Sequence, residues 1–221
     1  MIAALRQFYG LQPTPPADLF QFLVWEILSE NALPARRDLA WQALRRIPAL
    51  TPDAMFRAPA KVLLHAVGSA GPNPEDKVER IRATVGEFKR HRHLLDVAIL
   101  RRGSSLRADR ALRRLTHVPS AVRARAHLFV LDAPVLPIDD DITRVASRLM
   151  GLPQNRTRAV SRRWLSRELP REPGALRDAV YLGHHARHTC VKVAPHCGVC
   201  PLRVQCRSAS ASASSATPPG A

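Results

Sequence analysis

Apolar residues recur at three- and four-residue spacing along nearly the whole chain, and sustained alternation of apolar and polar residues is hard to find. The first pattern is typical of helices that bury one face, and the second marks half-buried strands. The clearest helix follows Asp18, a residue suited to an N-cap. The apolar positions of this helix are Leu19, Phe22, Leu23, Ile27 and Leu28. The pattern therefore predicts an all-α fold.

The same spacing predicts further helices downstream. They are expected at 78–88, at 94–100 ending near Gly103, at 107–115, at 120–131, at 140–150, around Trp164 and at 174–188. Two prolines interrupt the pattern in the segment 132–137, because proline lacks an amide donor and fixes its φ. We expect this segment to be the hinge between two domains. The last residues, 208–221, are Ser, Ala, Pro and Gly without apolar periodicity, and we expect them to be disordered.

The chain is strongly basic, with a formal net charge of +16 over 221 residues. So much positive charge favours a polyanionic partner, with DNA the leading candidate and a solvated basic surface the alternative. Lysine occurs at only four positions, Lys61, Lys77, Lys89 and Lys192, so lysine chemistry has few places to occur. No secretory signal and no stretch long enough to span a bilayer is recognisable. We therefore expect a cytoplasmic protein, associated with the nucleoid if bacterial, with no membrane contact.

All four cysteines lie within seventeen residues, as Cys190, Cys197, Cys200 and Cys206. Four thiolates from one compact loop suit an iron–sulfur cluster, because soft metal centres prefer thiolate ligands. Structural zinc is the alternative, although such sites usually use two close cysteine pairs and this loop has one. Disulfides fit poorly with a chain expected in the cytoplasm. The loop therefore predicts a metal centre, with iron–sulfur favoured.

The spacing Cys-x6-Cys-x2-Cys-x5-Cys near the C-terminus of a helical chain resembles the cluster loop of the endonuclease III family of DNA glycosylases. Upstream, residues 115–145 resemble that family's helix-hairpin-helix and the motif that follows it, with matches at Ile138, Asp139, Ile142, Arg144 and Val145. The resemblance implies a four-iron, four-sulfur cluster held by the four cysteines. It also implies a basic loop against the DNA backbone, with charge from Lys192, His196 and Arg203.

The resemblance makes Asp139 the candidate catalytic carboxylate. A glycosylase needs such a group beside the sugar, either to stabilise an oxocarbenium-like transition state or to activate the attacking nucleophile. From the residues alone, Asp139, Asp140 and Asp141 are better explained as the cap and first-turn acids of the next helix, and only the resemblance, through their position relative to the cysteines, favours catalysis. We expect Asp140 and Asp141 to keep that structural role.

The sequence departs from the family at the hairpin. The position of the family's Schiff-base lysine is occupied by Ala121, and the two hairpin glycines are replaced by His117 and Pro119. Proline removes an N–H donor, so phosphate binding by this turn is weakened. The neighbouring Arg123 and Arg125 can supply charge toward DNA, but arginine stays protonated and cannot act as an amine nucleophile.

A further match places Leu28, Ser29, Glu30 and Asn31 on a family segment whose glutamine fills the gap left by a flipped base. Asn31 is then the expected plug, shorter by one methylene, and Glu30 adds negative charge toward a polyanion. The alternative is that Asn31 caps the helix that it ends.

The resemblance implies two helical lobes with a DNA-binding cleft between them. We expect 19–132 to form a helical barrel domain, 1–18 with 133–207 to form the iron–sulfur domain, and Asp139 to lie in the cleft. The implied partner is double-stranded DNA with a damaged or mispaired base. A monomer is expected to bind the DNA and to flip that base into a pocket.

Three functions stay open from the sequence. The leading one is a monofunctional glycosylase, in which Asp139 positions water and no Schiff base forms because Ala121 has no amine. The second is a DNA-binding protein of the same fold with little or no catalytic activity. The third is a bifunctional glycosylase and AP lyase that recruits another lysine.

Overall fold

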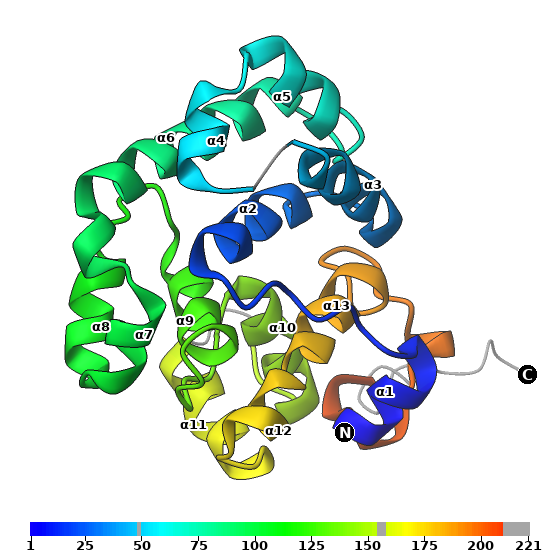
Figure 1. The fold of residues 1–221 in the computed structure, drawn as a ribbon. Helices are drawn as coiled ribbons and strands as arrows, with labels where there is room; N and C mark the ends of the chain where they lie inside the picture. Colours follow the sequence, from blue (N-terminus) through cyan, green and yellow to red (C-terminus); the bar gives the residue numbers. More distant parts are fainter. Residues whose placement is uncertain (48–49, 154–157, 210–221) are drawn as a thin grey trace, which may run out of the picture. The chain divides into compact units, whose positions relative to one another are not determined.

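The computed structural model describes residues 1–47, 50–153 and 158–209. Within these ranges the chain forms helices joined by turns and loops, without a β-strand (Figure 1), which confirms the all-α prediction. It divides into two compact units, Thr14–Ala133 and Met1–Pro13 with Pro134–Ala221. We call the first the α2 unit and the second the cysteine unit. None of the helices in the described ranges is long and apolar enough to cross a membrane.

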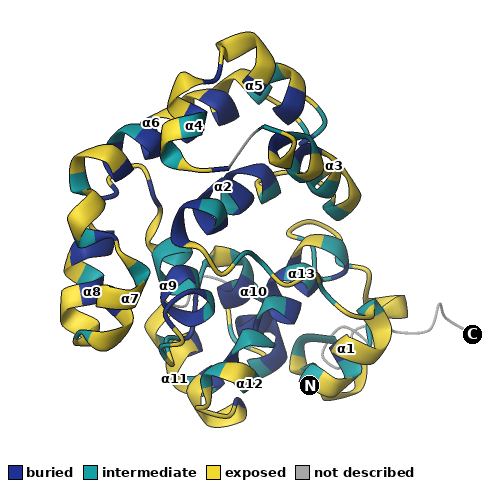
Figure 2. Cartoon of the chain, in the orientation of Figure 1, coloured by how far each residue is buried: buried dark blue, intermediate teal, exposed yellow. Residues whose placement is uncertain are grey.

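The α2 unit is built around one apolar helix. Its helices are α2 (Leu19–Ser29), α3 (Pro34–Arg45), α4 (Pro52–Arg57), α5 (Ala60–Val67), α6 (Pro74–His91), the 3₁₀ helix η1 (Arg92–Leu94), α7 (Val97–Arg102), α8 (Ser105–Leu112) and α9 (Ser120–Phe129). Helix α2 packs against α3, α6 and α9, and eight of its eleven residues are buried (Figure 2). Its N-terminus is capped as predicted, since the Asp18 carboxylate accepts the Gln21 N–H at 2.9 Å.

Helix α6 is the longest in the α2 unit, and the charged residues at its two ends interact favourably with the helix dipole. Pro74 stands in its first turn, followed by Glu75 and Asp76, and three basic residues close its last turn. Its buried face carries the apolar residues predicted from the sequence, including Val78 and Ile81. Helix α6 packs against α2.

The cysteine unit combines the N-terminal helix with the C-terminal third of the chain. Its helices are α1 (Ile2–Tyr9), α10 (Asp140–Met150), α11 (Arg158–Glu168), α12 (Pro173–Arg177), α13 (Val180–His188) and the 3₁₀ helices η2 (Cys197–Val199) and η3 (Arg203–Gln205). Helix α10 packs against α11 and α13, and α1 packs against α13. Two contacts hold α1 and the residue after it against the C-terminal part of this unit. Arg6 and Asp178 form an ion pair of 2.5 Å, and the Tyr181 hydroxyl donates to the Gly10 carbonyl.

The segment 174–188 differs from the single helix predicted. It forms α12 and α13 with a turn at Asp178 and Ala179, because the backbone N–H groups there bond three residues back instead of four. Of the tail predicted to be disordered, Ser208 and Ala209 are described and residues 210–221 lie outside the described ranges.

The buried His127 of α9 generates a prediction about pH. Burial lowers its pKa from 6.5, and Asp109, whose Oδ1 lies 3.9 Å from Nε2, opposes this effect. The unfolded chain therefore binds more protons than the native state once the pH falls below about 6.5. Between that pH and the lower pKa of native His127, we therefore expect the free energy of unfolding to fall as the pH falls. The fall due to His127 is at most about 1.4 kcal/mol per pH unit.

The measurement is chemical unfolding of the wild type and His127→Gln between about pH 7.5 and about pH 5.5. The wild type should lose stability relative to the variant as the pH falls. His93→Gln, which changes an exposed histidine, serves as the matched control. Parallel pH profiles for the wild type and His127→Gln contradict the prediction.

Candidate active site and cysteine loop

Asp139 is the N-cap of α10. Its backbone is extended, and its Oδ1 accepts the Ile142 N–H at 2.8 Å while its own carbonyl accepts the Thr143 hydroxyl at 2.7 Å. The residue is partly exposed. Aspartate suits this position because its carboxylate satisfies one of the unpaired amides of the first turn. The structure thus shows Asp139 as a helix cap, and its catalytic role stays a prediction.

The next two aspartates lie in the first turn of α10 and make ion pairs. Asp140 is exposed and accepts from Arg158 at 2.8 Å, and Asp141 accepts from Arg144 at 2.8 Å within α10. These contacts agree with the structural role predicted for both residues.

Two arginines of α10 bind the start of the cysteine loop. Arg144 donates to the carbonyl oxygens of Cys190 and Ala186, at 3.1 Å and 2.9 Å. Arg148, which is 9% exposed, donates to the carbonyls of Val191 and Lys192 at 2.7 Å and 3.0 Å. It also donates to the carbonyl and the Sγ of Cys190. Arg148 was not predicted from the sequence, although its four-residue spacing from Arg144 places both side chains on one face of α10.

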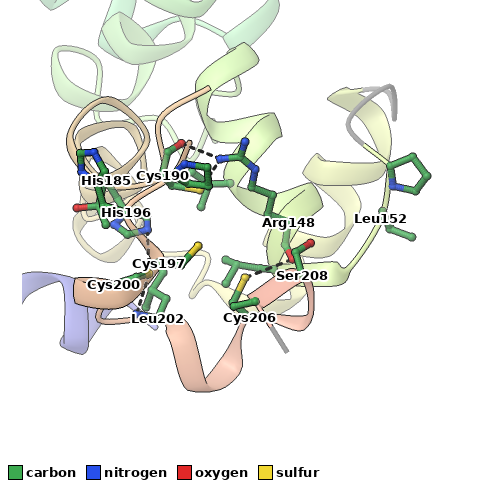
Figure 3. Close-up of a pocket in the computed structure, with 16 residues that line it drawn as sticks. Arg148, Leu152, His185, Cys190, His196, Cys197, Cys200, Leu202, Cys206 and Ser208 are labelled. Atoms are coloured by element: carbon green, nitrogen blue, oxygen red, sulfur yellow. Dashed lines mark hydrogen bonds between the residues drawn. The ribbon is translucent and has the colours of Figure 1, made fainter. Parts of the chain in front are cut away.

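The four cysteines line one cavity of about 360 Å³ in the cysteine unit (Figure 3). Two N–H donors point at these sulfurs: the Leu202 backbone nitrogen lies 3.4 Å from the Sγ of Cys200, and Arg148 Nη1 lies 3.3 Å from that of Cys190. None of the four cysteines forms a disulfide. In the described ranges, no three His, Cys, Asp or Glu side chains are placed to hold one metal ion together. The thiols thus surround a space instead of converging on a point.

A partly buried hydrogen-bond network includes two residues that line the cavity, His185 and Thr189. His185 of α13 is 1% exposed, and its Nε2 lies 3.7 Å from the Sγ of Cys200. Its Nδ1 is 2.8 Å from the Tyr9 hydroxyl, which is 2.5 Å from the Thr189 hydroxyl. Burial lowers the pKa of His185 to about 4, so the ring is neutral near pH 7, and burial raises the pKa of Tyr9. Tyr9 was not predicted from the sequence, because no local pattern connects α1 to α13.

The hairpin before α9 uses its amides inside the α2 unit. The Thr116 N–H and hydroxyl both donate to Oε1 of the buried Glu87, at 2.9 Å and 2.5 Å, and the Val118 N–H donates to the Leu115 carbonyl. Pro119 has no N–H to offer. His117 is exposed, with Nε2 at 3.9 Å from Glu87 Oε1.

The two arginines predicted to face DNA near the hairpin also have partners within the α2 unit. Arg123 donates to the Val118 carbonyl, and Arg125 pairs with the Glu26 carboxylate, with 2.6 Å between Nη2 and Oε2. Ala121 is the second residue of α9. By contrast, Lys192 and Arg203 on the cysteine loop are exposed.

The segment that follows α2 is held by a buried lysine. Lys77 of α6 donates to the carbonyls of Ile27 and Glu30 at 3.0 Å and 2.5 Å, and burial lowers its pKa. Arg80 pairs with the Glu30 carboxylate. Asn31 has a φ of 52°, in the left-handed region that asparagine tolerates at helix ends. The carbonyl oxygen of Asn31 lies close to Gly71. A Cβ atom at position 71 would lie only 2.9 Å from that oxygen.

The solved structures similar to this chain include two complexes of endonuclease III with DNA. One is a trapped covalent intermediate described as an estranged-adenine complex, and the other is non-covalent. Each is 16% identical to this chain with a TM-score of 0.68, over 96% of this chain and 95% of the other. The chain has the endonuclease III fold.

A thermostable thymine-DNA glycosylase is also similar, with 15% identity and a TM-score of 0.63 over 95% of both chains. No protein-family model and no curated protein sequence matches the chain. The resemblance to endonuclease III drawn from the cysteine spacing and the Asp139 motif is thus confirmed in the fold.

Within this endonuclease III fold, Lys77 is predicted to stabilise the turn after α2. Lys77→Met keeps the apolar stem and leaves two carbonyl groups without the ammonium, which should lower the free energy of unfolding by about 1–3 kcal/mol. We also expect faster amide hydrogen exchange at residues 29–32. Lys61→Met, at an exposed lysine of α5, is the control, and equal losses in both variants would argue against capping by Lys77.

Proposed function

We propose that the chain is a monofunctional DNA glycosylase that flips and excises a damaged or mispaired base from double-stranded DNA. Its net charge of +16 and its likeness to endonuclease III, which was solved in complexes with DNA, support a DNA substrate. The observation that carries the proposal is Asp139, a partly exposed carboxylate fixed at the start of α10. Such a group activates water or stabilises the positive charge that develops on the sugar.

The absence of an amine at Ala121 supports the monofunctional assignment. Schiff-base chemistry needs an unprotonated lysine beside the sugar. The Lys77 ammonium is buried and donates to two carbonyls, and Lys89 pairs with Asp53 and lies over the Phe56 ring. In this proposal water is the nucleophile, and the products are a free base and an intact abasic strand.

The test is base release from duplexes carrying thymine glycol, uracil or an alkylated purine, under single-turnover conditions with and without alkali. Asp139→Asn should lower the rate by about 10²–10⁴-fold, the usual contribution of a general base. The fold should be retained, because asparagine caps a helix as well as aspartate does. Breaks should appear only after alkali, and borohydride should trap no protein–DNA adduct.

Asp140→Asn provides the matched control, since it removes the same charge from the adjacent residue, which pairs with Arg158. A similar loss of rate in both variants would sink the role given to Asp139. A borohydride-trapped adduct in the wild type would instead overturn the monofunctional assignment.

A second candidate is a DNA-binding protein of the same fold without catalysis. The hairpin favours it, because Thr116 and Val118 use their amides internally and Pro119 has none. The role of Asp139 as a helix cap also gives that residue a purely structural purpose. Unchanged duplex binding with no base release from either the wild type or Asp139→Asn would establish this function.

We further propose that Cys190, Cys197, Cys200 and Cys206 hold a four-iron, four-sulfur cluster. All four line one cavity, and their thiolates are the ligands that such clusters prefer. A single zinc ion needs four sulfurs about 2.3 Å from one centre, whereas a cubane cluster takes each thiolate on a different iron and needs them spread apart. Bound there, the cluster would cross-link the loop and add a redox-active centre.

Metal analysis tests this assignment directly. Protein purified without oxygen should contain about four irons per chain, and Cys200→Ser should contain less. Ser208→Ala, which changes a cavity residue that is not a proposed ligand, is the control. One zinc per chain in place of iron would overturn the assignment.

A further inference from the structure

Among the described residues of the cysteine unit, two nitrogens lie near the sulfur of Cys200. One is the backbone N–H of Leu202 at 3.4 Å, and the other is Nε2 of His185 at 3.7 Å. His185 is buried and, like the four cysteines, lines the cavity (Figure 3). A side-chain contact of this kind can be altered without changing a ligand or the loop backbone.

The opposite side of the same ring is fixed by α1. Nδ1 of His185 lies 2.8 Å from the Tyr9 hydroxyl, and the Tyr9 oxygen lies 2.5 Å from Oγ1 of Thr189. When Thr189 donates to Tyr9 and Tyr9 donates to Nδ1, the proton of the neutral ring is on Nε2, facing the sulfur. With the hydroxyls reversed, Nδ1 carries the proton and Nε2 can accept from a Cys200 thiol.

Cluster binding would select between these two arrangements. A metal-bound thiolate has no proton to donate, so an Nε2 without a proton would face a second electron-rich atom. An Nε2–H in contrast donates to the sulfur and stabilises its negative charge. The ligated state therefore favours the arrangement in which Tyr9 donates to Nδ1.

We propose that His185 donates its Nε2–H to the Cys200 thiolate, with Tyr9 setting the tautomer, and thereby raises the reduction potential of the bound cluster. This inference rests on the cluster assignment made under the proposed function. Hydrogen bonds to cluster sulfurs and their surroundings tune the potential, because they stabilise the more negative, reduced form.

Arg148 makes a similar contact with Cys190, but it also binds three loop carbonyls, so its replacement would disturb the loop as well as the sulfur. His185 has no comparable role in holding the loop backbone through its side chain. It is therefore the side chain at which tuning can be separated from loop structure.

The experiment compares the wild type, His185→Phe, Tyr9→Phe and His184→Phe as cluster-loaded proteins. His184 is the matched control, since it lies on α13 and its ring contacts that of Tyr9, yet it does not line the cavity. Iron content is measured first, and the reduction potential then by film voltammetry. The Fe–S stretching bands are recorded by resonance Raman spectroscopy in H₂O and D₂O.

We expect His185→Phe to shift the potential to a more negative value and to reduce the deuterium sensitivity of the Fe–S bands. Tyr9→Phe should shift both in the same direction by a smaller amount, and His184→Phe should match the wild type. Unchanged potentials in His185→Phe and Tyr9→Phe with full iron content overturn the role of His185.

If His185→Phe loads no cluster, the test rests on Tyr9→Phe, because that change leaves every sulfur contact in place. An unchanged reduction potential in Tyr9→Phe then overturns the proposal. Absence of iron from the wild type overturns the cluster assignment and this inference with it. The iron measurement therefore distinguishes failure of the cluster assignment from failure of the tuning role.

Discussion

The cysteine unit depends on the burial of one positive charge. The guanidinium of Arg148 projects from α10 and is 9% exposed. Removing a cation from water costs several kcal/mol unless its donors are satisfied. Here the carbonyls of Cys190, Val191 and Lys192 satisfy them, so the loop has to follow a path that presents these oxygens to one side chain. The first cysteine is positioned by this constraint, and the loop that carries the others starts from it.

The same helix connects the two proposed functions of the unit. Helix α10 carries Asp139 at its N-terminus and, further along, the two arginines that bind the loop. It also packs against α13, which holds His185 next to the sulfur of Cys200. A helix transmits position along its length because its backbone hydrogen bonds resist bending. The candidate carboxylate and the cysteine cavity thus share one rigid support.

The number of basic residues, 34 Lys and Arg, overstates how many of their side chains can contact the proposed DNA partner. Arg125 is paired with Glu26, Arg123 donates to a carbonyl, and Lys77 donates to two. These groups give much of their hydrogen-bonding capacity to the fold of the α2 unit. Lys192 and Arg203, in contrast, are exposed on the cysteine loop. The predicted DNA contacts therefore differ in how much of each side chain remains for a phosphate.

What the sequence by itself determined is local. The all-α class, the cap at Asp18 and the helix that begins after Asp139 follow from short-range spacing, because helix periodicity and capping involve residues three or four apart. The cysteines could also be grouped from the sequence, since a seventeen-residue segment keeps them close. The resemblance to endonuclease III built on such local motifs agreed with the fold.

The tertiary structure decided which distant groups meet. Tyr9 reaches His185 across 176 residues, and Arg148 reaches the loop across more than forty. Such pairs depend on how helices pack, and packing buries side chains by shape and area with little trace in the local pattern. For the same reason the partners of Arg125 and Lys77 could not be predicted. The sequence does not show whether a basic side chain faces solvent or a carboxylate. The packing of the helices determines its surroundings.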